Sequence, residues 1–473
     1  MVHATRTVIA MERVEFLAQD RVTDDASILT LKNCVCEPLL RWHSGKVFPG
    51  LFEKWQLSPD GLSWQFRIPP GATFHDGTPC TSSCIAEFID NILNSVDMFG
   101  MKWSYARYLD GAAIETPASD ILKVRTASPF PDLVDIFAEF HVSALDKSGL
   151  PTLGTGAWKV VEYEPGVRVR LIPSSGTGEC VDFLSMPSAE DRLTSLQDGT
   201  VSCAMQLEKL AAPRRSLDGF NWVESDGNLS VIAFMNGRSG PFAWPEARLA
   251  ANLAIDRSAL VSGVMGGLAS PAKTVVSPFH LGYGEAGSAP VVHDPARAQT
   301  MLQESGAPTE VLLRSPEYMP ERAPEIAGFI ADALRETGFH VDVQIEPDRP
   351  EYARQLGRKE MGDLAIFDSS PRSTFRVLDD KISSETASVW WQGVDDPRAN
   401  ELFTSARRTL DPGMRARAYG ACLAHLGRHP HWLYLFHPKV CMAHATAFKG
   451  LSLDPGGAVQ VFRHRIQGTQ DES

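Results

Sequence analysis

The chain has 473 residues, which is more than one hydrophobic core usually holds, so we expect two or three lobes. Hydrophobic residues make up 43% and charged residues 22%, ordinary values for a globular protein. The 45 basic and 58 acidic residues give a formal net charge of −13, which argues against nucleic acid or an anionic membrane as a partner.

The N-terminal stretch from Met1 to Ala10 has no basic segment followed by a long apolar one, so no signal peptide is visible. Two interpretations stay open: a leader has been removed, or the protein is cytoplasmic. No apolar run approaches the ~18–20 residues of a membrane helix, so we expect no membrane insertion. The chain has eight cysteines, a number that favours the cytoplasmic option, and none has zinc-site spacing. We expect buried free thiols.

The first third predicts short helices and hairpins separated by turns. In the turn Phe74–Pro79, an Asx-type bond at Asp76 is a better explanation of the His75-Asp76 pair than acid–base chemistry. Thr81 is placed to cap a helix over 82–95, and an amphipathic helix is expected over Phe130–Phe140.

The stretch Gly149 to Leu171 has the most informative pattern in the sequence. Leu153-Gly154-Thr155-Gly156 allows a sharp turn, and Trp158, Val160 and Tyr163 begin a strand that Glu164-Pro165-Gly166 reverses. The pattern predicts a hairpin entered through a tight turn.

The remaining chain alternates strands with helices, which is typical of an α/β lobe. Asp256 is expected to cap a helix. The predicted strands are Val231–Asn236, Val341–Ile345, Gly362–Phe367 and Trp432–Phe436; the predicted helices are Pro245–Ala254, Pro324–Gly338, Arg398–Leu410 and Pro412–Arg428.

Several motifs in this order resemble the family-5 extracellular solute-binding proteins. They are GTGAWK with its following Tyr163 and Pro165-Gly166, FHDGTP at Phe74, and the run from Asn236 through Pro241-Phe242 to Ile255-Asp256-Arg257. The resemblance covers about Thr7 to Leu451. It implies an α/β, two-lobed periplasmic-binding-protein-like fold of type II, from the large cluster with an extra subdomain, with mixed sheets flanked by helices. Lobe I would be 1–232 plus 443–473, with a small subdomain inserted at about 43–148, and lobe II would be 233–442.

The resemblance also implies a function. We expect a binding protein that captures a small polar solute (a modified peptide, an amino-acid derivative, an opine-like solute or a metal chelate) in an interlobe cleft. It would deliver the solute to the permease and ATPase of an ABC importer, as a periplasmic or cell-surface monomer without a cofactor. The alternative is a cytoplasmic enzyme or ligand sensor that reuses this fold, because fold alone does not decide function.

The loop after Phe367 is the expected ligand site. Peptide binders of the family place an Asp about four residues later, to pair with the peptide ammonium, but this chain has Ser370 or Pro371 there, followed by Arg372. A guanidinium in a cleft favours carboxylate or phosphate. The other candidate ligand-binding residues are Asp368, Phe375, Trp103, Tyr105, His141, Trp390 and Trp391, of which the tyrosine and the tryptophans would form flat walls.

Two other kinds of site are not favoured. The histidines His425, His429 and His431 lie at helical and near-helical spacing, but no carboxylate or cysteine completes a metal set locally, so we expect surface histidines at a helix end. Nickel binders of the family use a His where this chain has Ser388 or Val389. No catalytic motif such as G-x-S-x-G or H-E-x-x-H is present, and we name no catalytic residue.

Overall fold

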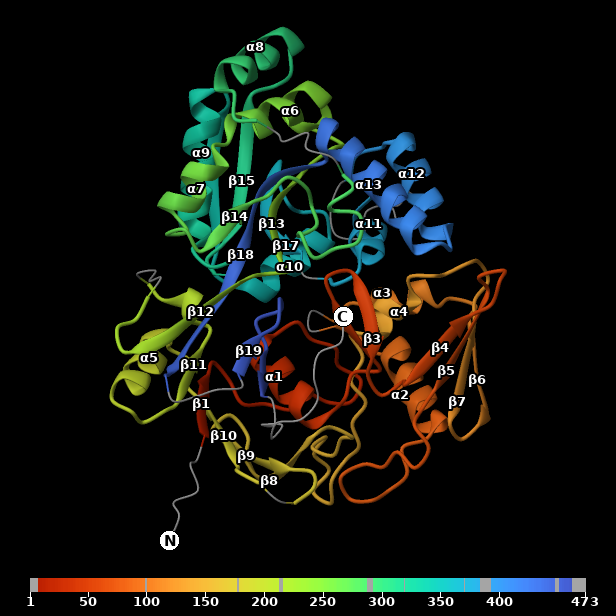
Figure 1. Cartoon of the computed structure of the whole chain (residues 1–473). Coiled ribbons are helices and arrows are strands. Elements are labelled where there is room, and N and C mark those ends of the chain that lie inside the picture. Colours follow the sequence, from red (N-terminus) through yellow and green to blue (C-terminus); the bar gives the residue numbers. More distant parts are fainter. Residues whose placement is uncertain are drawn as a thin grey trace.

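The computed structural model describes residues 7–97, 100–176, 178–211, 216–286, 292–318, 320–369, 371–382, 393–446 and 451–461. Figure 1 shows an upper lobe, a lower lobe and a smaller body beside them. One sheet of 12 strands runs through both lobes, in the order β16-β15-β17-β13-β18-β11-β1-β10-β9-β8, with β12 and β14 also paired to β18.

The lower lobe contains the N-terminal strand. β1 (Thr7–Met11) pairs in parallel with β10 (Val181–Ser185) and β11 (Cys203–Met205), so the carboxyl ends of these strands lie along one edge. Its other elements are α1 (Ala26–Val35), β8 (Trp158–Glu164), β9 (Arg168–Pro173), α5 (Ala189–Gln197), η1 (Leu207–Lys209), β12 (Phe220–Asp226), β19 (Leu451–Leu453) and β20 (Val459–Val461).

The expected hairpin forms from β8 and β9, and the two glycines before it are needed on steric grounds. A Cβ on Gly154 would lie 2.0 Å from Val35 O, and one on Gly156 would lie 2.5 Å from Cys34 O. His75 Nε2 bonds to Gly156 O at 2.9 Å, which ties the FHDGTP turn to this one. The tight turn therefore exists because the end of α1 passes against its backbone.

The body at the right of Figure 1 is called the side subdomain here; it is a four-stranded sheet, order β4-β5-β7-β6, with α2, α3 and α4. Its bounds are β4 (Lys54–Leu57), β5 (Ser63–Arg67), α2 (Ser82–Asn94), α3 (Ser104–Tyr108), β6 (Ala113–Ala118), β7 (Ile121–Arg125) and α4 (Leu133–Phe137). The hairpin β2 (Leu40–His43) and β3 (Lys46–Pro49) leads into it.

The turn at Asp76 and the helix after Phe130 were both predicted for this region. The Asx turn is confirmed, because Thr78 N donates to Asp76 Oδ1 at 2.9 Å. The helix expected over Phe130–Phe140 is wrong in length, since only Leu133–Phe137 is helical. The chain leaves the helix because the carbonyl of Phe140 accepts from Leu39 N at 2.8 Å, next to a bridge between Pro38 and His141.

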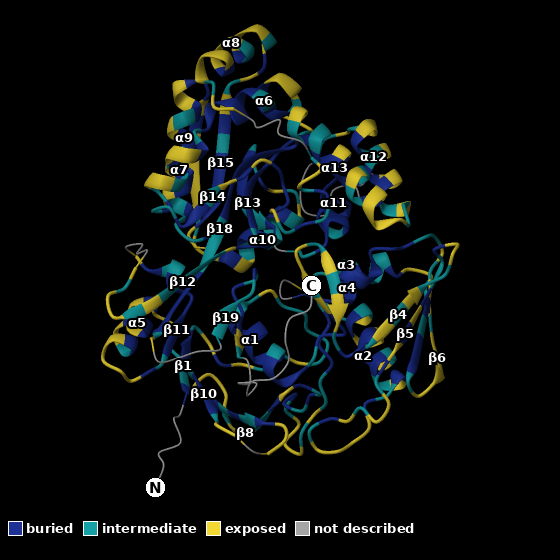
Figure 2. Cartoon of the chain, viewed as in Figure 1, coloured by how far each residue is buried: buried dark blue, intermediate teal, exposed yellow. Residues whose placement is uncertain are grey.

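The upper lobe is an α/β layer in which helices cover both faces of the sheet (Figures 1 and 2). Its strands are β13 (Ser230–Met235), β14 (Ala269–Pro271), β15 (Glu310–Pro316), β16 (His340–Glu346) and β17 (Leu364–Ser369). Its helices are η2 (Pro241–Ala243), α6 (Pro245–Ala254), α7 (Arg257–Gly263), α8 (Pro295–Ser305), α9 (Ala323–Glu336), α10 (Arg349–Gly357), α11 (Thr374–Ile382), α12 (Pro397–Arg408) and α13 (Pro412–Arg428). Asp256 caps α7 as predicted, accepting from Ala259 N at 2.9 Å.

β18 (Trp432–Ala445) joins the two lobes and corrects the predicted strand Trp432–Phe436, which is too short. Its first part pairs with β13, its middle with β14, and its last part with β11 and β12. The strand continues because partners from both lobes follow one another along it. Pro438, which lacks an N–H, sits at the change of partners.

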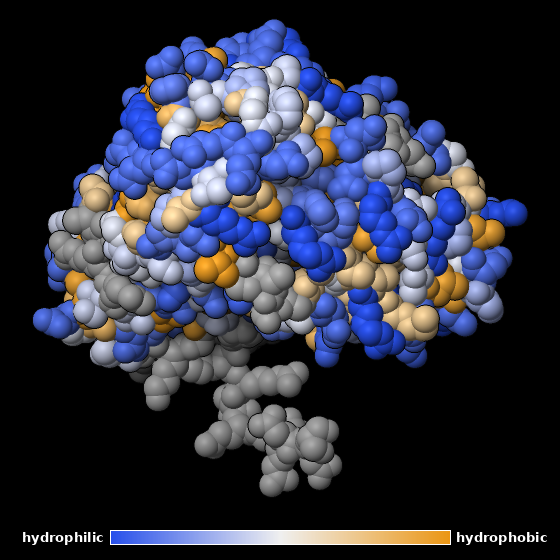
Figure 3. Space-filling model, turned by 90° about the horizontal axis from the view of Figure 1, so that it is seen from above, coloured by the Kyte–Doolittle hydropathy of each residue, from blue (hydrophilic) through white to orange (hydrophobic). Residues whose placement is uncertain are grey.

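The hydrophobic core also connects the parts of the chain. The largest cluster of buried apolar residues includes side-subdomain residues and residues of α11, α12 and α13. Phe375 of α11 packs on Phe130 and Tyr108, with ring centroids 4.9 and 5.0 Å apart. Seen from above, the outer surface is mostly hydrophilic (Figure 3).

The predicted free thiols are confirmed. No disulfide links any of the eight cysteines, all of which lie among the described residues; six are buried, and Cys84 and Cys180 are half-buried. Burial raises the pKa of Cys34, Cys36 and Cys203 to about 12, so these thiols are neutral and unreactive.

Candidate functional site

The boundary between the lobes collects the carboxyl ends of strands from both sides. β15 and β17 are parallel in the upper lobe, and β1, β10 and β11 are parallel in the lower lobe. The segment after β15 carries Glu321 and Arg322 to the segment after β11, where Arg322 Nη2 donates to Leu210 O at 2.7 Å. Open α/β sheets bind ligands outside the carboxyl ends of their strands, so this boundary is the candidate site.

Arg372 lies at this boundary, between β17 and α11. Its backbone N–H donates to Glu139 Oε1 at 3.3 Å, and its Nη2 lies 4.0 Å from Asp454 Oδ2. The arginine side chain is 16% exposed, so it is neither a free surface charge nor fully enclosed. Asp454 belongs to the turn between β19 and β20, and burial raises the pKa of its carboxyl.

His141 is buried near Arg372. Its Nε2 bonds to Asn33 Oδ1 at 2.9 Å. Its pKa lies well below the ordinary value, first because of burial and then because Lys32 and Arg372 are positive neighbours, with Arg41 also contributing. Burial lowers the pKa of Lys32 to about 8. Positive charge from Lys32, Arg372 and Arg41 therefore acts on this histidine.

Asp368 is the penultimate residue of β17. Burial raises the pKa of its carboxyl, and the nearby Arg349 opposes this rise with Nη2 at 3.7 Å. The Arg349 guanidinium lies 4.6 Å from the centre of the Phe367 ring. The next residue, Ser369, has a buried hydroxyl with no hydrogen-bond partner among the described residues.

The aromatic candidates differ from the walls that were expected. Tyr105 is fully buried and donates its hydroxyl hydrogen to Glu139 Oε2, and Phe375 is 1% exposed within the core. Trp103 is half-buried, with its ring 5.6 Å from that of Tyr105. The two predicted walls Trp390 and Trp391 lie outside the described residues.

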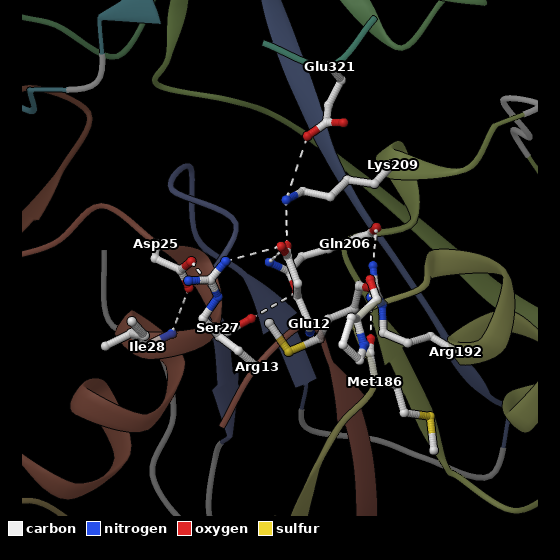
Figure 4. Close-up of polar contacts among 12 residues, drawn as sticks. Glu12, Arg13, Asp25, Ser27, Ile28, Met186, Arg192, Gln206, Lys209 and Glu321 are labelled. Carbon is white, nitrogen blue, oxygen red and sulfur yellow. Dashed lines mark hydrogen bonds and ion pairs between the residues drawn. The ribbon is translucent and has the colours of Figure 1, made fainter. Parts of the chain in front are cut away.

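A second polar cluster, which we did not predict, lies where β1 and β11 end (Figure 4). Lys209 Nζ is 2.5 Å from Glu12 Oε2 and 3.6 Å from Glu321 Oε1 of the upper lobe. Gln206, in a left-handed conformation (φ 54°), accepts from Glu12 N at 3.0 Å through Oε1. Glu12 and Gln206 directly follow β1 and β11, and Lys209 is the last residue of η1, but no local pattern shows that these residues meet.

The expectation of surface histidines holds for His429, which is exposed, but is wrong for His425 and His431. His431 is 1% exposed and His425 is half-buried, and each has Nε2 bonded to Asp396 Oδ2, at 3.0 and 2.8 Å. Asp396 also caps α12 by accepting from Ala399 N, and these contacts lower its pKa although burial opposes the change. The carboxylate comes from about 30 residues away, so local spacing could not reveal it.

Across the described ranges, no group of three or more His, Cys, Asp and Glu side chains is arranged to hold a metal ion. In the same part of the chain, no helix has the length and apolar character needed to cross a membrane.

Solved structures share this fold. HbpA2 from Haemophilus parasuis superimposes with a TM-score of 0.77 at 17% identity, covering 97% of this chain and 100% of that one. AgaA from A. tumefaciens R10, solved with agropinic acid, has a TM-score of 0.75 at 20% identity, covering 97% and 99%. These likenesses confirm the predicted two-lobed α/β fold.

Comparisons of sequence also find similarity to solute-binding proteins along most of the chain. The glutathione-binding protein GsiB of Escherichia coli O1:K1 is 23% identical over 435 residues, which cover 86% of this chain and 83% of that protein. The dipeptide-binding protein of Escherichia coli K12 is 24% identical over 487 residues, covering 92% and 89%. The model of the bacterial extracellular solute-binding proteins, family 5, matches residues 46–375, and the chain belongs to this family.

Proposed function

We propose that this protein captures a small polar solute with a carboxylate or similar anionic group, and holds it between the lobes beside Arg372. The observation that carries the proposal is the charge around this residue. Among the described residues its guanidinium has one ion-pair partner, Asp454 at 4.0 Å, which is beyond hydrogen-bond distance. Lys32 and Arg41 add positive charge at the neighbouring His141. A carboxylate would receive the bidentate bonds that Asp454 does not make.

The relatives support an anionic ligand. GsiB is named for glutathione and AgaA was solved with agropinic acid, and both molecules contain carboxylates. The aspartate that peptide-binding members of the family place about four residues after Phe367 is absent here, since Ser370 or Pro371 stands at that position. We therefore favour an acidic solute, such as an opine-like or modified-peptide compound, over an ordinary dipeptide.

The family works as the solute-binding component of ABC importers, and its members are periplasmic or extracellular. We propose the same role here, with a permease and an ATPase as partners. The lobes would be 1–232 with 443–473, including the inserted part at about 43–148, and 233–442. The segments between β12 and β13 and around Pro438 of β18 would form the hinge, because strand partners change there.

Isothermal titration calorimetry of the purified chain tests the proposal. The probes are glutathione, agropinic acid, an unmodified dipeptide and nickel–histidine, each repeated with a carboxamide or ester form where one exists. We expect at least one acidic probe to bind, and its carboxyl-blocked form to bind much more weakly.

Arg372→Ala is expected to weaken binding of that probe by about 2–5 kcal/mol, the usual cost of removing one partner of a buried charged contact. Arg358→Ala is the matched control, since Arg358 forms surface ion pairs with Glu351 and Glu360, within the upper lobe. If Arg372→Ala binds within a factor of two of the parent protein, the anionic-ligand proposal fails. If only carboxyl-blocked probes bind, it fails as well.

A further inference from the structure

The Glu139 carboxylate makes three polar contacts, all with side-chain or backbone groups of other elements. It lies two residues after α4 of the side subdomain. Its Oε2 accepts from Arg376 Nη1 at 2.5 Å and from the Tyr105 hydroxyl, and its Oε1 accepts from the backbone N–H of Arg372 at 3.3 Å. Two of the three partners belong to the upper lobe, on α11 and the loop before it.

The same face of α11 is bound by α3. Arg107 Nη2 lies 2.5 Å from Asp380 Oδ1 and 3.0 Å from Asp379 Oδ2. The Tyr108 hydroxyl donates to Asp380 Oδ1 at 2.6 Å. The contact between the side subdomain and α11 therefore consists of paired charges and tyrosine hydroxyls as well as apolar packing.

These charges are largely removed from water. The side chain of Glu139 is 8% exposed and that of Arg376 is 17% exposed. The Arg376 guanidinium also lies 4.8 Å from the centre of the Tyr105 ring. Burial lowers the pKa of Arg376, but attraction from Glu139 and the two tyrosines outweighs it, so the net pKa is well above the ordinary value. The arginine is therefore charged, and the pair is an ion pair with low solvent access.

The surroundings of Glu139 and Arg376 would differ between a closed arrangement of the molecule and one in which the side subdomain and the upper lobe have separated. In an open arrangement, the side chains of both Glu139 and Arg376 would be hydrated. In the closed arrangement they satisfy each other. Removing Glu139 leaves Arg376 with only the more distant Asp380, whose Oδ2 lies 4.0 Å from Arg376 Nε, and removing Arg376 leaves the Glu139 carboxylate without its ion-pair partner. Both changes are unfavourable. The pair therefore selects the closed geometry more than it adds net stability. Because Glu139 also binds Arg372 N, the geometry that it selects fixes the start of the loop beside the proposed ligand.

We infer that Glu139 is an interlobe clasp: by binding Arg376 and the Arg372 backbone, it holds α11 against the side subdomain and closes the two halves of the molecule. The clasp does not depend on which solute binds. It requires that the side subdomain and the upper lobe can separate, and that Glu139 and Arg376 act as a pair.

Small-angle X-ray scattering of the protein without added solute, with hydrogen exchange of α3 and α11, tests the clasp. Glu139→Gln keeps the side-chain shape and removes the charge. We expect this variant to have a larger radius of gyration, faster exchange in α11, and a closed-to-open ratio at least about tenfold lower than the parent. Glu351→Gln is the matched control, because it removes ion pairs to Arg354 and Arg358 that stay within the upper lobe.

A double substitution distinguishes a clasp from general damage to the interface. Glu139→Gln combined with Arg376→Gln removes both charges, so neither is stranded in the closed form. We expect the double variant to be closer to the parent than either single variant, a non-additive result that independent contacts do not give. Far-ultraviolet circular dichroism verifies folding, and Tyr105→Phe, which removes one donor only, provides a milder variant with an intermediate shift.

Three results would overturn the inference. The parent protein could scatter as an open molecule, in which case the clasp is not formed in solution. Glu139→Gln could keep the parent's radius and exchange pattern, in which case the apolar packing of Phe375 alone closes the boundary. The effects of the two single substitutions could be additive in the double variant, in which case Glu139 and Arg376 do not act together. None of these readouts uses a bound solute, so they stand or fall separately from the anionic-ligand proposal.

Discussion

Two buried charged side chains in this protein, Arg192 and Glu139, have their partners outside their own elements. Arg192 of α5 is fully buried and donates to four backbone carbonyls, those of Met186, Pro187, Met205 and Gln206 (Figure 4). A sequence pattern shows that an arginine is present but gives no indication of which carbonyls it will meet. The same holds for Glu139, whose partners lie 34 to 237 positions away. For this reason the sequence indicated Arg372 as a candidate site residue but gave no indication of Glu139, which binds its backbone N–H.

Asp135 is a buried charge without full compensation. It is 8% exposed, on α4. Burial raises its pKa well above the ordinary value, repulsion from Asp132 adds to the rise, and Arg415 opposes it. A carboxyl whose pKa is higher in the folded than in the unfolded state stabilises the fold when it is protonated. That contribution is lost as the pH rises through the folded-state pKa.

We therefore expect Asp135→Asn to be more stable than the parent at about pH 8, by on the order of 1–3 kcal/mol, the range for a buried polar group that lacks compensation. At pH values near the ordinary carboxyl pKa of about 4, the two proteins are expected to be equally stable. Urea unfolding at several pH values measures the difference. A gain that is the same at every pH would show that the ionisation of Asp135 is not its cause.

At the scale of elements, the sequence predicted the structure correctly where that structure is determined by neighbouring residues. Asp256 before α7 was recognised because capping acts within a few residues. The glycines before β8 were recognised as turn residues, but the close approach that requires them comes from Val35 and Cys34 at the end of α1. The predictions failed where the cause is distant. α4 ends early because Phe140 pairs with Leu39, and β18 is long because strands of both lobes pair with it in turn.

The turn before β8 gives a direct test of close approach. A Cβ on Gly154 would lie 2.0 Å from Val35 O, and backbone atoms have little freedom to move. Gly154→Ala is expected to cost at least about 2 kcal/mol of unfolding free energy. Gly328→Ala in α9, where nothing lies within 4 Å of the added methyl group, is expected to gain about 0.5–1 kcal/mol. Equal effects of the two substitutions in urea unfolding would contradict the steric explanation.

At the scale of the whole molecule, the fold was predictable because many family motifs occur in the right order along one chain. The site was less predictable because three parts of the chain contribute to it: α1 supplies Lys32, the end of β17 leads to Arg372, and the β19–β20 turn supplies Asp454. Their meeting depends on how the lobes are placed, which local patterns do not encode. Two of the predicted walls, Trp390 and Trp391, lie outside the described residues.

A close backbone contact lies where the chain crosses between the lobes. Gly227, between β12 and β13, donates its N–H to Pro438 O of β18 at 3.1 Å, and a Cβ there would lie 2.4 Å from that same oxygen. Gly227→Ala must therefore push the connection away from β18 at the place where strand partners change between the lobes. We expect a loss of about 1–3 kcal/mol in unfolding free energy, together with a changed radius of gyration, because the two lobes meet through these strands. Gly263→Ala, with no atom within 4 Å, is the control. If Gly227→Ala loses stability but keeps the parent's radius of gyration, the crossing is a structural contact and does not set the angle between the lobes.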